Sequence, residues 1–299
     1  MKYLIAILLL LCGCSSGNAP DVPVKRPEDM GNKYEVPEFA EASFHEDLAI
    51  VDGKVMFDLS GVEEGYIAVS AVSDKRLKFQ VTKEDVYYYD MKNDGTPSIF
   101  PLQSGDGRYV FRVCENIVES SYAYIAEASA DVVMIDEFQP YLRRNDYVPY
   151  DRDSECVKLA SRFAEESYSV FDVIDQVFRY VCKNVTYDKA KAESVQSGYL
   201  PDPDETLATG KGICFDYASL TASMLRSQGI PTKLIFGYVS PNDVYHAWNM
   251  IYTEEAGWIV AEFKVNENDW NRIDLTFSAN GAESRFIGDG GNYTDVYQY

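Results

Sequence analysis

The residues best suited to chemistry are Gly210-Lys211-Gly212-Ile213-Cys214, where a thiol lies at the predicted start of a helix. Free backbone N–H groups and the positive end of the helix dipole stabilise a thiolate at such a position, and Lys211 adds nearby positive charge. The glycines let the backbone turn sharply and approach a substrate closely. The pattern predicts a cysteine nucleophile rather than a buried core thiol.

A cysteine nucleophile needs a base, and His246 is the single histidine in the C-terminal half of the sequence. A third group should hold the imidazole in the correct tautomer, and Asp274 follows a short β-like run at residues 270–273. The sequence therefore predicts a catalytic triad of Cys214, His246 and Asp274.

Three blocks of the sequence resemble the transglutaminase-like superfamily. Residues 206–218 with 225–231 resemble its nucleophile segment, residues 245–249 its histidine block and residues 270–277 its aspartate block. The resemblance covers about residues 160 to 299 and implies a papain-like Cys–His–Asp fold, with a central helix packed on an antiparallel sheet. The segment 286–293 is similar to the tail of lipid-anchored bacterial members.

Two parts of this resemblance leave alternatives open. The usual Asp-Pro-Thr reads Asp274-Leu275-Thr276 here, and an alignment on Trp258 would place Glu262 in the third position. We prefer Asp274 because the whole Trp-x-x-x-Asp-x-Thr-Phe string matches there. For the oxyanion, the backbone N–H of Cys214 is one expected donor, and the resemblance makes Tyr187 a candidate for the second.

The elements that must position these residues follow from hydrophobic periodicity. Amphipathic helices are predicted over residues 154–166 and 170–183, and a third helix from residues 213–214 to 228, where Gly229 and Pro231 end it. The polar stretch containing Gly198, Pro201 and Pro203 is predicted to be a loop. Strands are predicted at residues 232–239, 247–252, 257–263 and 270–273, which gives an α+β layout for residues 141–299.

Residues 41–140 are predicted to form a β-sandwich-like domain, because short alternating runs are separated by turn signals. The runs lie at residues 54–59, 66–72, 77–81, 86–89, 109–113, 122–126 and 132–135. Its single histidine, His45, has no partner pattern and is predicted to be a surface residue. Cys156 and Cys182 follow helical stripes in the second domain and are predicted to be small buried hydrophobes.

The N-terminus resembles a bacterial lipoprotein signal. Lys2 precedes an apolar run that is too short to span a bilayer, and Gly13 precedes Cys14. We expect residues 1–13 to be a signal peptide, Cys14 to carry lipid, and the proline-containing residues 14–40 to be a tether. The alternative is an ordinary cleaved signal. The lipoprotein interpretation places the protein outside the cytoplasm on the cell membrane, anchored by acyl chains.

Composition excludes some classes of partner. The net charge of −21 argues against nucleic acid, because a phosphate backbone needs clustered lysine and arginine. No spacing indicates a metal or an organic cofactor; the turn-like Asp289-Gly290 segment lacks the carboxylates of a calcium loop. The expected substrate is a protein, a peptide or a cell-wall peptide. Hydrolysis through a Cys214 thioester is favoured, with protein crosslinking or a non-catalytic binding module as alternatives.

Overall fold

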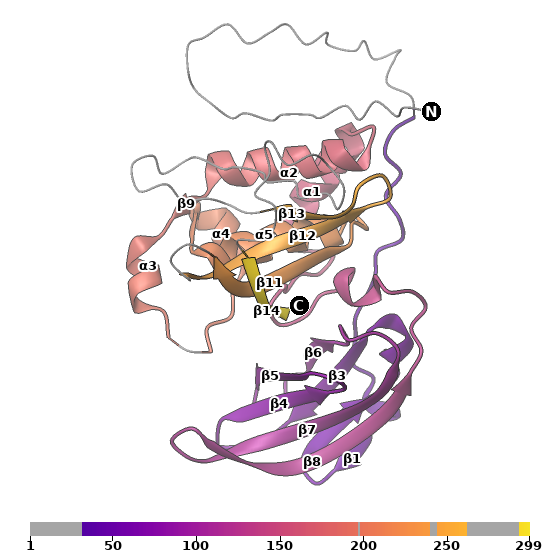
Figure 1. The fold of residues 1–299 in the computed structure, drawn as a ribbon, viewed down its shortest axis with the longest axis vertical. Helices are drawn as coiled ribbons and strands as arrows, with labels where there is room; N and C mark the ends of the chain where they lie inside the picture. Colours follow the sequence, from indigo (N-terminus) through magenta and orange to yellow (C-terminus); the bar gives the residue numbers. More distant parts are fainter. Residues whose placement is uncertain (1–31, 197, 240–243, 262–292) are drawn as a thin grey trace, which may run out of the picture.

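The computed structural model describes residues 32–196, 198–239, 244–261 and 293–299. Figure 1 shows that these residues form two parts, with the strands of residues 50–132 at one end of the molecule and the helices and strands from residue 155 onward at the other. The predicted α+β class, with β structure first and a helix-and-sheet region after it, is confirmed.

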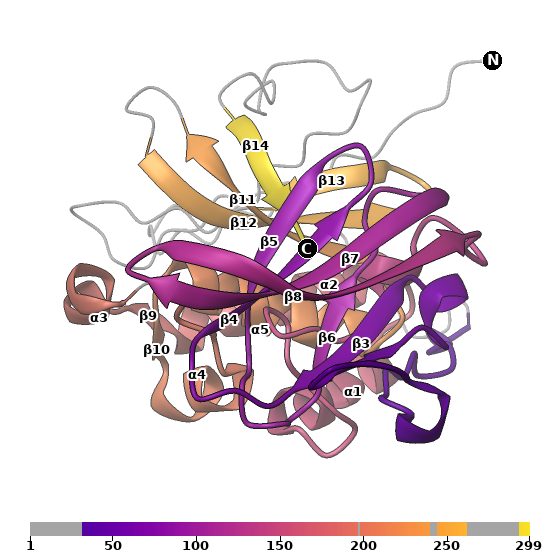
Figure 2. The same cartoon turned by 90° about the horizontal axis from the view of Figure 1, so that it is seen from below.

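Two antiparallel four-stranded sheets make the first part, and they form the layers of a sandwich (Figures 1 and 2). In spatial order, the first contains β1 (Ile50–Asp52), β2 (Val55–Asp58), β3 (Tyr66–Ala71) and β6 (Ser98–Pro101). The second contains β5 (Val86–Met91), β4 (Leu77–Thr82), β7 (Gly107–Val118) and β8 (Ser121–Val132).

The core of this sandwich is aromatic. In β7, Tyr109, Phe111 and Val113 are completely buried while the residues between them are more exposed, as expected for a strand with one face on the core. Phe79 of β4 stacks on Phe100 of β6 with ring centroids 4.2 Å apart, so this pair joins the two sheets. Each such buried ring contributes about 1.5–3 kcal/mol of transfer free energy.

The second part packs helices against a third sheet. Its principal helices are α1 (Glu155–Glu166), α2 (Val170–Asn184) and α5 (Cys214–Arg226). Its antiparallel sheet has the spatial order β13 (Gly257–Ala261), β12 (Val244–Thr253), β11 (Thr232–Val239) and β14 (Tyr293–Gln298). The shorter elements are α3 (Lys189–Ser194), α4 (Pro203–Thr209), the strands β9 (Thr186–Tyr187) and β10 (Lys211–Gly212), and the 3₁₀ turns Glu46–Leu48, Val62–Glu64 and Gln139–Tyr141.

Helix α5 lies at the centre of this part. Every residue of it from Phe215 to Arg226 is buried, because α1 and α2 contact it and β12 crosses it as well. Arg226, in its last turn, donates to the carbonyl oxygens of Thr232, Arg143 and Tyr299 at 2.8, 2.7 and 2.7 Å. Burial lowers the pKa of Arg226 to about 10. These bonds tie the C-terminal end of the helix to the linker, residues 133–154 between β8 and α1, to the start of β11 and to the residue after β14.

The two parts share one continuous core. Tyr299 lies between them, with its ring 4.5 Å from that of Tyr147 in the linker and 5.4 Å from that of Tyr89 in the sandwich, measured between centroids. Gln103 of the sandwich donates to the carbonyl oxygen of Gln298 at 3.0 Å. The sandwich is therefore fixed against the sheet that holds β12.

Most of the predicted helices and strands are found. The predictions need correction mainly where pairing with a distant strand decides whether a strand forms. The expected strand at 132–135 is wrong, because the antiparallel pairing with β7 extends β8 continuously to Val132 and the chain leaves the sheet there. The predicted loop around Gly198 contains α4, whose N-cap Asp202 accepts from the N–H of Glu205 at 3.0 Å, and α3 precedes it. Sequence patterns missed β6, which pairs with the distant β3.

Other predictions about single residues can be compared with the fold. Cys156 is completely buried and Cys182 packs partly buried against the core, as predicted. The side chain of His45 is 46% exposed, with Nδ1 3.2 Å from Oδ2 of Asp58, so it is a surface residue as predicted. Within the residues that the structure describes, no helix has the length and apolar character needed to cross a bilayer.

Candidate active site

Cys214 is the first residue of α5, as the sequence predicts. Two glycines shape the turn that leads to it. Gly210 has φ of +62°, and a Cβ there would lie 2.7 Å from the carbonyl oxygen of Asn184. A Cβ on Gly212 would lie 2.6 Å from the Cβ of Asp216. Both positions need glycine, because any side chain would push the thiol-bearing turn away from its neighbours.

Tyr187 lies beside this turn. Strand β9 pairs in parallel with β10, so that Tyr187 is opposite Gly212, and the N–H of Asp188 donates to the carbonyl oxygen of Gly212 at 2.9 Å. Burial raises the pKa of the Tyr187 hydroxyl, and the nearby Cys214 and Asp216 raise it further. The tyrosine chosen as an oxyanion candidate is thus near the thiol and keeps its proton as a hydrogen-bond donor; that it serves the oxyanion stays a prediction.

His246 lies on β12, which crosses the nucleophile helix. The side-chain amide of Asn249 on this strand donates to the carbonyl oxygen of Ala218, one turn into α5, at 3.0 Å. The backbone N–H of Ala247 interacts with the sulfur of Cys214. Because His246 is the neighbour of Ala247, two residues 32 positions apart in sequence are brought to the same place.

The third position of the triad lies outside the described residues. Asp274, its alternative Glu262 and the predicted strand at 270–273 all fall within residues 262–292, as does Asp289. The described part of the sheet ends at Ala261 of β13, which pairs with Asn249. The assignment of the carboxylate therefore stays a prediction from the sequence.

Burial is the largest influence on the Cys214 thiol. Desolvation raises its pKa above the ordinary value, while the N–H groups of Ala247 and Phe215 lower it and the carboxylate of Asp216 raises it again. The helix start does favour the thiolate as the sequence suggests, but desolvation outweighs it. A thiol with a raised pKa must lose its proton to a base when it attacks, which is the role predicted for His246.

The sequence patterns do not identify Asp216 and its partners, which lie near the thiol. Asp216 is completely buried and accepts from the N–H of Ile213 at 2.8 Å, which caps the helix. Its carboxylate also binds Lys191 Nζ at 2.8 Å and the hydroxyl of Tyr199. An acidic residue three positions after the N-cap is a capping signal that could have identified Asp216. Nothing local in the sequence indicates its partner lysine.

Aromatic side chains border the thiol on the β12 side. Tyr245, next to His246, is 51% exposed and stacks on Phe236 with centroids 5.9 Å apart. Tyr238, opposite it on β11, is 43% exposed and packs edge-on against it at 5.3 Å. Trp248 is buried, as predicted for a core residue. Tyr245 lies near the thiol, and together the two exposed rings form an apolar surface on which a substrate could lie.

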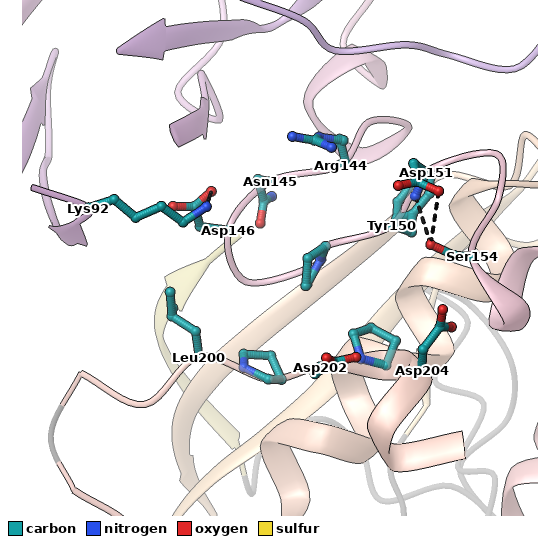
Figure 3. Close-up of a pocket in the computed structure, with 13 residues that line it drawn as sticks. Lys92, Arg144, Asn145, Asp146, Tyr150, Asp151, Ser154, Leu200, Asp202 and Asp204 are labelled. Atoms are coloured by element: carbon teal, nitrogen blue, oxygen red, sulfur yellow. Dashed lines mark hydrogen bonds and ion pairs between the residues drawn. The ribbon is translucent and has the colours of Figure 1, made fainter. Parts of the chain in front are cut away.

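A separate pocket of about 400 Å³ lies between the linker and the start of α4 (Figure 3). Two of its carboxylates serve as helix caps: Asp204 accepts from the N–H groups of Glu155 and Cys156, both at 2.9 Å, and Asp202 caps α4. Among the described residues, its lining comes from the sandwich, the linker and residues 200–204, not from α5 or β12. We assign it no part in the thiol chemistry.

Comparison with known proteins identifies the class of the second part. Residues 157–263 match the model of the transglutaminase-like superfamily. These residues therefore match the superfamily that the sequence blocks resemble. The match contains Cys214 and His246; it ends just after Glu262 and before Asp274, so it does not decide between the two carboxylates.

Curated relatives match over part of their own length. Over 98 residues the chain is 30% identical to UPF0252 protein MJ1282 of Methanocaldococcus jannaschii, covering 31% of this chain and 27% of that protein. Over 234 residues it is 25% identical to the uncharacterized protein YebA of Bacillus subtilis, covering 64% of this chain and 31% of that protein. The chain spans less than a third of the length of either relative.

Among solved structures, a proposed cysteine protease from Cytophaga hutchinsonii aligns over 79% of both chains, with 16% identity and a TM-score of 0.41. LapG of Legionella pneumophila aligns over 48% of this chain and 82% of its own, with 17% identity and a TM-score of 0.28. These similarities are distant.

Proposed function

We propose that this protein is an exported, lipid-anchored thiol enzyme that hydrolyses peptide or amide bonds through a Cys214 thioester. The observation that supports the proposal most directly is the interaction between the Cys214 sulfur and the N–H of Ala247, next to His246. It brings the backbone of the strand that carries His246, the one histidine of the C-terminal half, to a thiol at a helix start.

In the first step, His246 takes the thiol proton as the Cys214 sulfur attacks the carbonyl carbon of the substrate. The carbonyl oxygen becomes an oxyanion, which the backbone N–H of Cys214 and the hydroxyl of Tyr187 would bind. The C–N bond then breaks, and His246 returns its proton to the leaving amine. Asp274 would hold the imidazole and stabilise its charged form.

The thioester that remains is resolved by a second nucleophile. Water gives its proton to His246 and attacks the same carbon, the C–S bond breaks, and the sulfur recovers the proton, which releases a carboxylic acid. If a primary amine attacks instead, the product is a new amide and the enzyme is a crosslinking transglutaminase. Hydrolysis is proposed because Cys214 as a whole residue is partly exposed, so that water can reach the thioester although the thiol group itself is largely desolvated.

A substrate screen tests the proposal. Wild-type protein, Cys214→Ala and the control Cys182→Ala are incubated with peptides and cell-wall peptides, with and without a fluorescent primary amine. We expect C214A to lose activity by about 10³-fold or more and C182A to retain it. Identical products from wild type and C214A would favour a non-catalytic binding module, and amine incorporation would favour crosslinking.

The lipid anchor is a separate part of the proposal and rests on the sequence around Cys14. We expect the full chain to sediment with membranes when expressed in a bacterium, and Cys14→Ser to be released from them. A wild-type protein that stays in the soluble fraction would contradict the anchor without affecting the chemistry proposed for Cys214.

A further inference from the structure

Asp216 carries a negative charge in the same helical turn as the proposed nucleophile. Its side chain is completely buried, and it lies two residues after Cys214 in the first turn of α5. A carboxylate removed from water is expensive unless opposite charge and hydrogen bonds compensate it. Its negative charge also opposes formation of a thiolate at Cys214. The site therefore needs something that offsets this charge.

Lys191 supplies the opposite charge. Its Nζ lies 2.8 Å from Oδ2 of Asp216 and 2.6 Å from the hydroxyl of Tyr199, and the lysine side chain is 29% exposed. The hydroxyl of Tyr199 donates to the other carboxylate oxygen of Asp216. Because Asp216 is completely buried, this ion pair differs from one on the surface, which contributes little to stability.

The lysine is held in place by the segment that also carries Tyr187. Helix α3 follows β9 at once, and its N-cap Asp188 accepts from the N–H of Lys191 at 2.9 Å. The ring of Tyr199 contacts Phe215 edge-on at 6.1 Å. Lys191 and Tyr199 thus connect the chain that follows β9 to the first turn of the nucleophile helix.

We propose that Lys191 is a positioning residue that neutralises Asp216 and thereby sets the reactivity of the Cys214 thiol. Among the described residues, the other titratable side chains around this thiol are Tyr187 from β9, Tyr245 and His246 from β12, and the exposed Lys211 from β10. Neutral tyrosines add no charge near neutral pH, and Lys191 is the cation whose direct contact with Asp216 counteracts the carboxylate. The inference rests on the proposed function only in treating Cys214 as the nucleophile.

Alkylation of the full chain tests this without any substrate. The rate of Cys214 modification by iodoacetamide is followed by peptide mass mapping between about pH 6 and 10, for wild type, Lys191→Met and the control Lys183→Met. Lys183 is an exposed lysine on α2, so K183M removes the same charge elsewhere. We expect K191M to react about 10-fold more slowly near neutral pH, with its profile moved to higher pH, and K183M to match wild type.

A double variant separates charge from shape. Asp216→Asn removes the negative charge and keeps an oxygen for the N–H of Ile213, so K191M/D216N should recover most of the wild-type rate. Superimposable profiles of K191M and wild type would overturn the inference, as would a folded double variant that stays slow. Thermal unfolding identifies a variant that failed to fold, in which case Tyr199→Phe, which keeps both charges but removes the hydroxyl that bridges them, must react more slowly than wild type for the inference to stand.

The outcomes for the two proposals are distinguishable. A wild-type protein that cleaves no substrate while K191M still shifts the alkylation profile contradicts the proposed function alone. An active wild type whose thiol does not respond to K191M contradicts the role of Lys191 alone.

Discussion

The sandwich and the region around α5 are both well packed, but different kinds of side chain fill their interiors. In the sandwich, stacked rings such as Phe79 and Phe100 fill the space between two sheets. Around α5 the buried groups include Asp216 and Arg226, and each is held by hydrogen bonds to specific partners. Apolar contacts depend little on the orientation of the side chains, whereas hydrogen bonds fix the positions of the groups that they join. The difference indicates that the first region supplies stability and the second supplies geometry.

Replacing the predicted base should give the largest difference between an effect on catalysis and an effect on stability. We expect His246→Ala to lower amide hydrolysis by about 10³–10⁴-fold, because the thiol loses the group that takes its proton. Since burial raises the pKa of the Cys214 thiol, its alkylation in H246A should become fast only at alkaline pH. Alkylation at neutral pH unchanged from wild type would show that the imidazole does not act on this thiol.

Truncating a ring in the sandwich should have the opposite effect. Phe79→Ala removes a side chain that is completely buried between the sheets, and we expect unfolding free energy to fall by about 3–5 kcal/mol. The alkylation rate of Cys214 in the folded variant should stay at the wild-type value. Phe79→Leu, which refills much of the volume, serves as the control. A slower thiol in folded F79A would show that the shared core transmits packing changes to the site.

The smallest effect is expected at a surface carboxylate of the sandwich. Hydrogen bonds from Lys54, then Ser73 and Lys75, lower the pKa of Glu115 to about 2. A carboxyl whose pKa is depressed on folding stabilises the protein above its unfolded pKa, and this contribution disappears as the pH falls toward the folded value.

Glu115→Gln should therefore unfold at lower urea concentration than wild type near neutral pH, and the difference should shrink below about pH 4. Glu84→Gln, which removes an exposed carboxylate, is the control. A difference in the urea midpoints of E115Q and wild type that stays constant down to strongly acidic pH would contradict the lowered pKa of Glu115.

Much of the fold could be predicted because its signals are local. Helix α1 begins one residue after the predicted position, because its apolar spacing marks it, and α5 begins at Cys214 as expected, because glycines precede it. Strand β6 and the pairing of β14 with β11 were not predicted, because each depends on a partner far away in the sequence. The sequence predicts a loop where the short helix α4 lies, because the prolines of this segment mask the cap at Asp202.

For the site, the amino-acid sequence predicts Cys214 as the nucleophile, its place at a helix start and His246 as its base. These follow from residue types within a few positions of one another and from the scarcity of histidine. The packing of distant segments, in contrast, brings Ala247 to the thiol, raises the thiol pKa by burial and places Lys191 against Asp216. Desolvation and charge pairing depend on which distant segments pack together, and no local pattern encodes that.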